Sequence, residues 1–186
     1  FFAQRLRSTI YPLGQARKDN HEFIIRSKTG SLFKGKTSDF HAYPFSIQGY
    51  YEWRNIAIAK AVCQPGDEII EIGANIGTET VGFADIVKIN GKVHSFEPIE
   101  SNLKSLKELV QLNNFHQVIL YPYAAGNIQG IITFIQPSFE MSGIGHILGH
   151  HETPKNVVPV YCFPIDRFSL KFKRLTAIFI DAEGSD

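Results

Sequence analysis

Two short segments of the chain combine strand-like runs with residue types that can bind a nucleoside. Ile69 to Ile72 is an apolar run interrupted only by Glu71, and it leads into a glycine-containing bend, Gly73 to Gly77. Val93 to Phe96 is a second run, which ends in a lone acid, Glu97, twenty residues beyond Gly77. In an α/β sheet, such glycines let the backbone approach a ligand, and such an acid can accept hydrogen bonds from both ribose hydroxyls. The pattern predicts a nucleoside site at the carboxyl ends of two parallel strands.

The spacing within the bend distinguishes between two kinds of nucleoside cofactor. A dinucleotide fingerprint requires Gly-x-Gly-x-x-Gly, but Asn75 stands at its second glycine and Thr78 at its third. An acid-x-Gly-x-x-x-Gly pattern with an acid after the next strand instead suits S-adenosylmethionine. A nicotinamide-dependent oxidoreductase stays open as an alternative, and the missing middle glycine counts against it.

The flanking sequence predicts the elements that position this bend. Apolar residues recur at helical spacing from Tyr50 to Val62, and Gln64 to Asp67 contains the Pro-Gly pair that ends that helix. A short helix is expected from Thr78 to Val87, with Thr78 as its cap and its free N–H groups directed toward the ligand. Asn90-Gly91 then turns the chain into the second strand, Val93 to Phe96.

The second half of the chain predicts further strands around one helix. Pro98 can occupy the first turn of a helix that extends to Asn113, and Val118 to Tyr123 is expected to form the third strand. Ile131 to Ile135 and Val157 to Phe163 are expected to pair antiparallel. Leu175 to Ile180 is expected to be a further buried strand.

These elements predict an α/β fold with a Rossmann-like parallel core and an N-terminal extension. Residues 1–48 are assigned to the extension, in which His21 to Phe33 forms a hairpin around Lys28-Thr29-Gly30, and residues 34 to 49 are polar and turn-rich. Residues 49–186 are assigned to the core. One edge of the fourth core strand would be bare if the chain stopped there, so we expect a longer fold in which a helix and further strands follow.

Composition sets broad limits on the class of protein. The 186 residues are 44% apolar with a net charge of +1, which predicts one globular domain, and the scattered lysines and arginines predict no nucleic-acid partner. Cys63 and Cys162 lie in apolar runs and are expected to be buried free thiols. No stretch is apolar and long enough for a membrane span, and residues 1–7 lack a signal-peptide core, so a cytoplasmic protein is expected.

A series of motifs resembles the FkbM family of S-adenosylmethionine-dependent methyltransferases, which have the class I fold. In chain order the matching pieces are Gly49-Tyr50-Tyr51-Glu52, Pro65-Gly66-Asp67, Glu71 to Gly77, Ser95 to Pro98 with Asn102, Leu112-Asn113, Ala124-Ala125, Val158-Pro159-Val160 with Asp166, and Ile180 to Gly184. The closing Asp-x-Glu-Gly separates this family from other class I methyltransferases. The family usually has Lys two residues before that Asp, whereas this chain has Phe179.

The spacing and the resemblance together predict a set of cofactor-binding residues. Glu71 would offset the ligand's ammonium group, Glu97 would bind the ribose, and backbone groups of Tyr123, Ala124 and Ala125, which are expected to close the third strand, would contact the adenine. The full set is Glu52, Glu71, Gly73, Ala74, Asn75, Gly77, Thr78, Glu97, Pro98, Asn102, Tyr123, Ala124, Ala125 and Asp181. Glu52 enters this set through the resemblance alone, and it also fits a surface acid at a helix start.

The predicted reaction is transfer of a methyl group to a hydroxyl of a sugar, glycan or small metabolite, an acceptor class implied by the resemblance. Asp181 is the candidate for orienting the cofactor or acceptor, and Glu183 is the candidate general base. A divalent ion is used by some natural-product methyltransferases, but this sequence requires none. A chain that binds the cofactor without transferring methyl groups stays open as an alternative.

Three histidines, His146, His150 and His151, have a spacing that resembles a metal site. The glycines among them, Gly145 and Gly149, favour a mobile polar loop over the helix that would bring two of the histidines to one face. We therefore predict no metal here, and one of these histidines could serve as the base if the loop folds over the acceptor.

Overall fold

A parallel four-stranded sheet forms the centre of the computed structural model, which describes residues 6, 8–135, 146–147, 157–168 and 171–181. Its strands are β3 (Glu68–Ile72), β4 (Lys92–Phe96), β5 (Val118–Tyr121) and β10 (Leu175–Ile180). Their order is β10-β3-β4-β5, and every pairing is parallel. The predicted α/β class with a parallel core is confirmed.

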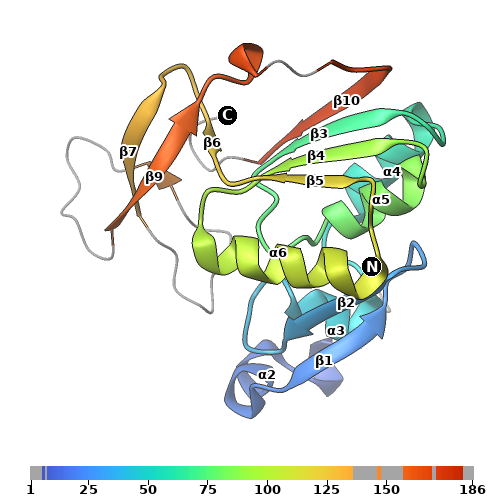
Figure 1. Ribbon diagram of the computed structural model, residues 1–186. Helices are drawn as coiled ribbons and strands as arrows, with labels where there is room; N and C mark the ends of the chain where they lie inside the picture. The colour runs from blue at the N-terminus through green and yellow to red at the C-terminus, as the bar shows by residue number, and fades with distance from the viewer. Residues whose placement is uncertain (1–5, 7, 136–145, 148–156, 169–170, 182–186) are drawn as a thin grey trace.

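Three helices cover one face of this sheet (Figure 1): α4 (Trp53–Val62), α5 (Thr80–Val87) and α6 (Glu100–Asn113). Ile69 and Val93 of adjacent strands are in register and point into the core with these helices. Alternation along β4 sends Phe96 to the opposite face, where its ring stacks on Tyr121 with centroids 4.5 Å apart. The chain through the short 3-10 helix η2 (Ile165–Arg167) covers part of that face, and the Phe168 ring meets Phe96 edge-on at 5.6 Å.

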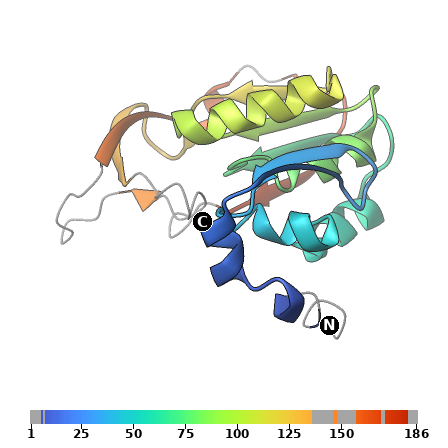
Figure 2. The same ribbon diagram turned by 90° about the horizontal axis from the view of Figure 1, so that it is seen from below.

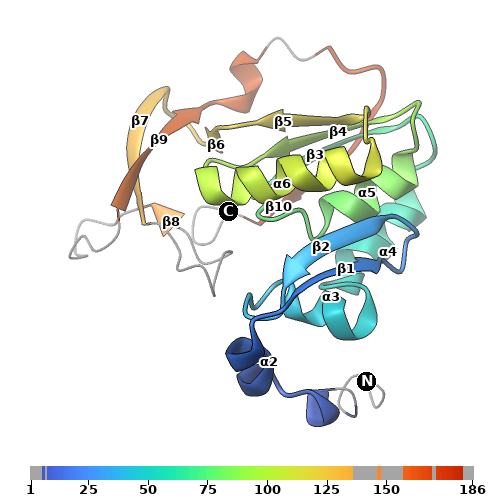
Figure 3. The same cartoon turned by 60° about the horizontal axis from the view of Figure 1, so that its bottom comes forward.

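A second sheet lies at the carboxyl ends of the central strands (Figure 3). It contains β6 (Ala124–Ala125), β7 (Gly130–Ile135), β8 (His146–Ile147) and β9 (Val157–Phe163), in the order β6-β9-β7-β8. The predicted antiparallel pair is confirmed as β7 and β9. The prediction that the third central strand runs to Tyr123 and is closed by Ala124-Ala125 was wrong. Pro122 has no N–H group to continue the ladder, and the two alanines pair with β9 instead.

The predicted N-terminal hairpin is confirmed as β1 (Glu22–Arg26) and β2 (Leu32–Lys36), which pair antiparallel. Two helices flank it, α2 (Leu13–Asp19) and α3 (Tyr43–Gln48), and Figure 2 shows the hairpin between α6 and α3 when the molecule is seen from below. The sequence prediction treated residues 34 to 49 as turns and missed α3. Asp39 Oδ1 accepts the N–H groups of His41 and Ala42 at 2.8 and 2.7 Å, so a buried acid supports the start of this helix.

Several boundary predictions were wrong at the scale of one turn. Helix α4 begins at Trp53 rather than Tyr50, and α5 begins at Thr80 with Glu79, not Thr78, in the N-cap position. Pro98 precedes α6, whose N-cap is Ile99. Fraying of helix ends makes such residues the hardest to place from sequence.

Strand β10 was predicted to be buried, and this was also wrong. Ile178 and Ile180 are 53% and 54% exposed, while Phe179 points to the other face and stacks on Phe83. Because side chains alternate along a strand, the exposed pair lies on the face opposite α4 and α5, at an edge of the described sheet. Cys63 and Cys162 are free and buried, as predicted. No helix among the described residues is long and apolar enough to cross a membrane.

Candidate functional site

The bend after β3 is held against the end of β4 by its own backbone. The N–H groups of Gly73 and Ala74 both donate to the carbonyl oxygen of Phe96, each at 3.0 Å. Gly73, Asn75 and Gly77 have φ angles of 83°, 51° and 91°, in the left-handed region where glycine and asparagine are tolerated best. The sequence of the bend thus permits the reversal that joins the two strand tips.

Gly77 has a second reason to lack a side chain. A Cβ atom there would lie 2.4 Å from Leu109 Cδ2 and 2.8 Å from Leu106 Cδ1, both on α6. This glycine was expected to allow the approach of a ligand, whereas the structure shows close packing of the bend against a helix.

Glu97 lies directly against this bend. Its Oε2 accepts the Asn75 N–H at 2.8 Å, and its Oε1 accepts the Ile99 N–H at 2.8 Å. Burial raises the pKa of Glu97 to about 7, against the lowering effect of these bonds and of one from Asn102. A carboxylate offers about four acceptor positions, so these three hydrogen bonds leave one position for a ligand hydroxyl.

An unsatisfied acceptor lies in the same bend. Within the described part of the chain, Asn75 Oδ1 is buried and has no hydrogen-bond partner. Buried polar atoms are rarely left unpaired, because the lost hydrogen bond costs about 1–3 kcal/mol. A ligand hydroxyl or ammonium group bound at the bend would supply the missing donor, so the residues present fit a nucleoside ligand.

A pocket of about 350 Å³ opens between α4, the bend, and the end of β10. Four carboxylic acids line it: Glu52, Glu71, Glu79 and Asp181. Its other lining residues are Arg54, Asn55, Ile58, Ile72, Gly73, Ile178, Phe179 and Ile180. The pocket thus brings together four of the predicted residues, Glu52, Glu71, Gly73 and Asp181.

Glu71 is the most deeply buried acid of the pocket, with 3% of its surface exposed. The hydroxyls of Thr80 and Ser95 donate to the same oxygen, Oε2, at 2.7 and 2.6 Å. Burial raises its pKa to about 8, and the charges of Glu79 and Glu97 act in the same direction. This raised pKa favours the protonated form of Glu71 at neutral pH.

Glu79 was not predicted from the sequence. Its Oε1 accepts a hydrogen bond from Asn55 Nδ2 at 2.7 Å, and its pKa is raised to about 7 by burial first and then by the negative charges of Glu52 and Asp181. One signal pointed to it: Glu79 follows Gly77-Thr78 at the start of the helix whose N-terminus was expected to face the ligand.

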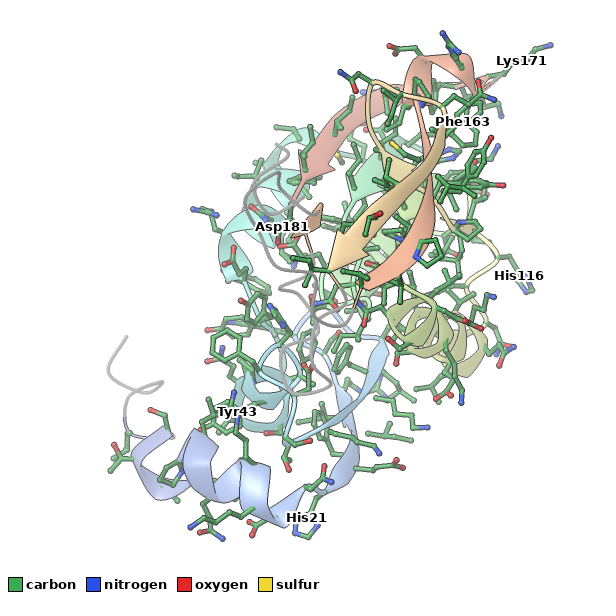
Figure 4. The ribbon with its side chains drawn as sticks, turned by 90° about the vertical axis from the view of Figure 1, so that its left-hand side faces the viewer. His21, Tyr43, His116, Phe163, Lys171 and Asp181 are labelled. Atoms are coloured by element: carbon green, nitrogen blue, oxygen red, sulfur yellow. The ribbon has the colours of Figure 1, made fainter. Side chains whose placement is uncertain are left out.

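Asp181 and Glu52 stand at the rim of the pocket. The Asp181 N–H donates to Ile72 O at 3.0 Å, which continues the parallel pairing of β10 with β3. Figure 4 views the molecule from the side toward which the central strands point, and Asp181 lies near the middle of that view. Glu52 forms an ion pair with Arg54 at 3.3 Å. Glu183 lies outside the described residues.

Other predicted residues lie away from this pocket or beside the bend. Thr78 and Asn102 are buried, and Pro98 follows Glu97 at the end of β4. Tyr123, Ala124 and Ala125 do not line the pocket; the alanines belong to the second sheet, and the Tyr123 ring packs on Tyr161 and Phe163.

The histidine-rich segment gives no metal site in the part of the chain that the structure describes. His146 contributes its backbone to β8, opposite Ile135 of β7, while His150 and His151 lie outside the described residues. Among the described residues, no group of three or more His, Cys, Asp or Glu side chains is arranged to hold a metal ion.

Comparison with known proteins gives partial likenesses at the level of structure. No protein-family model and no curated protein matches the chain. TYW2 from P. horikoshii in complex with MeSAdo is 17% identical over 60% of this chain and 39% of its own, with a TM-score of 0.46. An rRNA methylase from Streptococcus thermophilus is 16% identical (38% of this chain, 40% of its own, TM-score 0.35). Precorrin-6y C5,15-methyltransferase from Geobacter metallireducens is 18% identical over 38% of this chain and 37% of its own, with a TM-score of 0.34. The chain spans less than half the length of the first three structures that it matches, namely 41%, 38% and 29% of their chains.

Proposed function

We propose that this chain forms the cofactor-binding core of an S-adenosylmethionine-dependent methyltransferase of the FkbM type. One observation carries the proposal: the Glu97 carboxylate, at the tip of β4, is hydrogen-bonded to Asn75 inside the glycine bend at the tip of β3. A carboxylate and a turning backbone in contact at adjacent parallel strand ends are what a bound nucleoside requires. The ordered series of FkbM-like motifs supports the same function.

The residues divide the cofactor between two neighbouring parts of the site. Glu97 would accept a hydrogen bond from the ribose diol, and backbone groups near Tyr123 to Ala125 would contact the adenine. Glu71 and Gly73 line the pocket that would receive the methionine part, whose ammonium group complements the acids there. Asn75 Oδ1 would gain a donor from the ligand.

When bound, the cofactor supplies a methyl group on a positively charged sulfur, and the protein's residues align it with the acceptor. The acceptor in this proposal is a hydroxyl of a sugar, glycan or small metabolite. Methyl transfer would require the acceptor hydroxyl to lose its proton, and a carboxylate of the protein would take up that proton. Asp181 is proposed to orient the reactants and Glu183 to take the proton.

Titration with S-adenosylhomocysteine tests the proposal. We expect binding to the parent protein, and binding to Glu97→Gln that is weaker by about 1–3 kcal/mol, because the variant loses a charged hydrogen bond to the ribose. Glu22→Gln changes the charge equally on the distant hairpin and should bind as the parent does. Equal affinity of all three proteins, or no binding at all, would contradict the proposal.

Two other functions are distinguished by further measurements. Tighter binding of NAD than of S-adenosylmethionine would favour an oxidoreductase. Cofactor binding without methyl transfer to a panel of sugars, glycans, small metabolites and RNA would favour a binding protein that is not an enzyme.

A further inference from the structure

We infer that the acidic pocket selects a positively charged sulfonium cofactor over its neutral thioether product, and that Glu79 is the residue that determines this selectivity. The inference rests on the proposed function and extends it to exchange of product for cofactor at the same site. It follows from an imbalance of charge, from the position of a buried carboxyl group, and from proton linkage.

The first step is the charge imbalance in the pocket. Among the described lining residues, four are acids, and Arg54 is the one cation. The Arg54 side chain is 77% exposed and pairs with Glu52 at the rim. On the inner wall, β10 contributes Phe179, whose ring stacks on Phe83 with centroids 4.5 Å apart. Thus no described cation of the pocket wall faces Glu71 and Glu79 from within.

The second step is a carboxyl oxygen of a buried acid, Glu71, that is left for a ligand. Thr80 and Ser95 both donate to Oε2 of Glu71, and no hydrogen bond to its Oε1 is found among the described residues. Glu71 is 3% exposed and lines the pocket. Glu79 is held similarly, because Asn55 binds its Oε1. Each acid therefore has one oxygen outside the protein's own side-chain hydrogen bonds.

The third step concerns protons. The groups that act on Glu79 are Asn55 and Arg54 of α4, Glu52 before that helix, and Asp181 after β10, while Glu79 in turn acts on Glu71 of β3. Without a cation, burial and these like charges raise the pKa of Glu71 and Glu79 and so favour their protonated forms. The ammonium group of the ligand is common to cofactor and product, whereas a bound sulfonium adds a second positive charge, so a further carboxyl group ionises and its proton leaves to solvent. Loss of the methyl group removes that charge, and the proton returns.

Calorimetric titrations at pH 6 and pH 8 with S-adenosylmethionine, S-adenosylhomocysteine and sinefungin test the inference. Sinefungin carries an ammonium group at the position of the sulfonium. We expect the affinity of both cationic ligands to rise about tenfold from pH 6 to pH 8. Binding of a cation that lowers the Glu79 pKa from about 7 by a unit or more changes the affinity by about a factor of ten over this pH range. The affinity of the neutral product should change by less than about threefold.

Glu79→Gln keeps an oxygen that can accept the Asn55 hydrogen bond and removes the charge. We expect the affinity of this variant for the cationic ligands to lose its pH dependence. At pH 8, the ratio of its affinity for a cationic ligand to its affinity for the product should be about tenfold smaller than in the parent. The Glu22→Gln control should keep both properties. Circular dichroism checks folding, and the parent's own comparison of charged and neutral ligands tests the inference if the variant does not fold.

The outcomes separate the two proposals. Binding of all three ligands with the same pH dependence would overturn the charge selectivity and leave the methyltransferase proposal standing. An unchanged pH dependence in Glu79→Gln would overturn the role of Glu79. No binding of any of the three ligands would overturn both.

Discussion

At the scale of single residues, the central sheet contains buried acidic side chains that are held by hydrogen bonds. Glu71 in β3 has two hydroxyl donors, and Glu97 at the end of β4 has two backbone donors. On the opposite face of the sheet, Glu68 binds His94 at 3.1 Å. Burying a carboxyl group in this way costs free energy when it is ionised, which links the stability of the protein to pH.

Glu71→Gln should change that link. Folding raises the pKa of Glu71 from 4.5 to about 8, so the folded protein retains a proton that the unfolded chain releases. The stabilising contribution is complete below pH about 4.5 and is lost as the pH rises toward about 8. We measure the free energy of unfolding by urea denaturation at pH 5 and at pH 8. Between these two pH values we expect it to fall by on the order of a few kcal/mol less in the variant than in the parent. Parallel pH profiles for the parent and the variant would show that Glu71 is ionised throughout.

At the scale of elements, the glycine bend is a packing junction as well as a turn. It connects β3 to α5, it is hydrogen-bonded to the end of β4, and its last glycine lies against α6. Any change in the position of α6 is therefore transmitted to the loop that holds Asn75. This coupling follows from close packing, because interiors leave no space for an added methyl group.

Gly77→Ala should destabilise the fold by about 2–4 kcal/mol, from left-handed backbone strain and overpacking against Leu106 and Leu109. Thermal denaturation followed by circular dichroism measures the loss. Gly14→Ala in α2 is the matched control, since nothing lies within 4 Å of the added Cβ. A Gly77→Ala variant as stable as this control would show that the bend relaxes without cost.

At the scale of the whole molecule, the N-terminal hairpin is packed into the core of the central sheet. Phe33 of β2 is fully buried and stacks on Phe45 with centroids 3.9 Å apart. The Asn113 side chain at the end of α6 accepts the Leu32 N–H and donates to the Leu32 carbonyl, each at 2.8 Å. Hydrogen bonds and apolar contacts thus connect residues far apart in sequence.

Asn113→Ala should lower the free energy of unfolding by about 1–3 kcal/mol, because both polar groups of Leu32 lose their partner. We expect the parent and the variant each to unfold in one transition when fluorescence and circular dichroism are compared in urea. Gln111→Ala, on the exposed surface of the same helix, should be nearly neutral. Two separate transitions in the parent would indicate that the hairpin folds independently.

Much of the fold could be predicted from local patterns in the sequence. The parallel strands, the hairpin and the antiparallel pair β7 and β9 follow from runs of apolar residues and their turn signals. Helix α3 was missed because its support comes from Asp39 rather than from apolar periodicity. Ala124-Ala125 was assigned to the wrong sheet because the pairing partner of a two-residue strand lies far away in the sequence.

Local apolar runs and their spacing were enough to predict that a glycine bend follows one strand and Glu97 the next. Packing of elements far apart in the sequence was needed to bring Glu79 and Asn55 beside Glu71 in one pocket, and to place α6 where Gly77 must lack a side chain. The physical reason is that burial, charge imbalance and steric exclusion depend on which distant elements pack together, and no spacing along the chain encodes them directly.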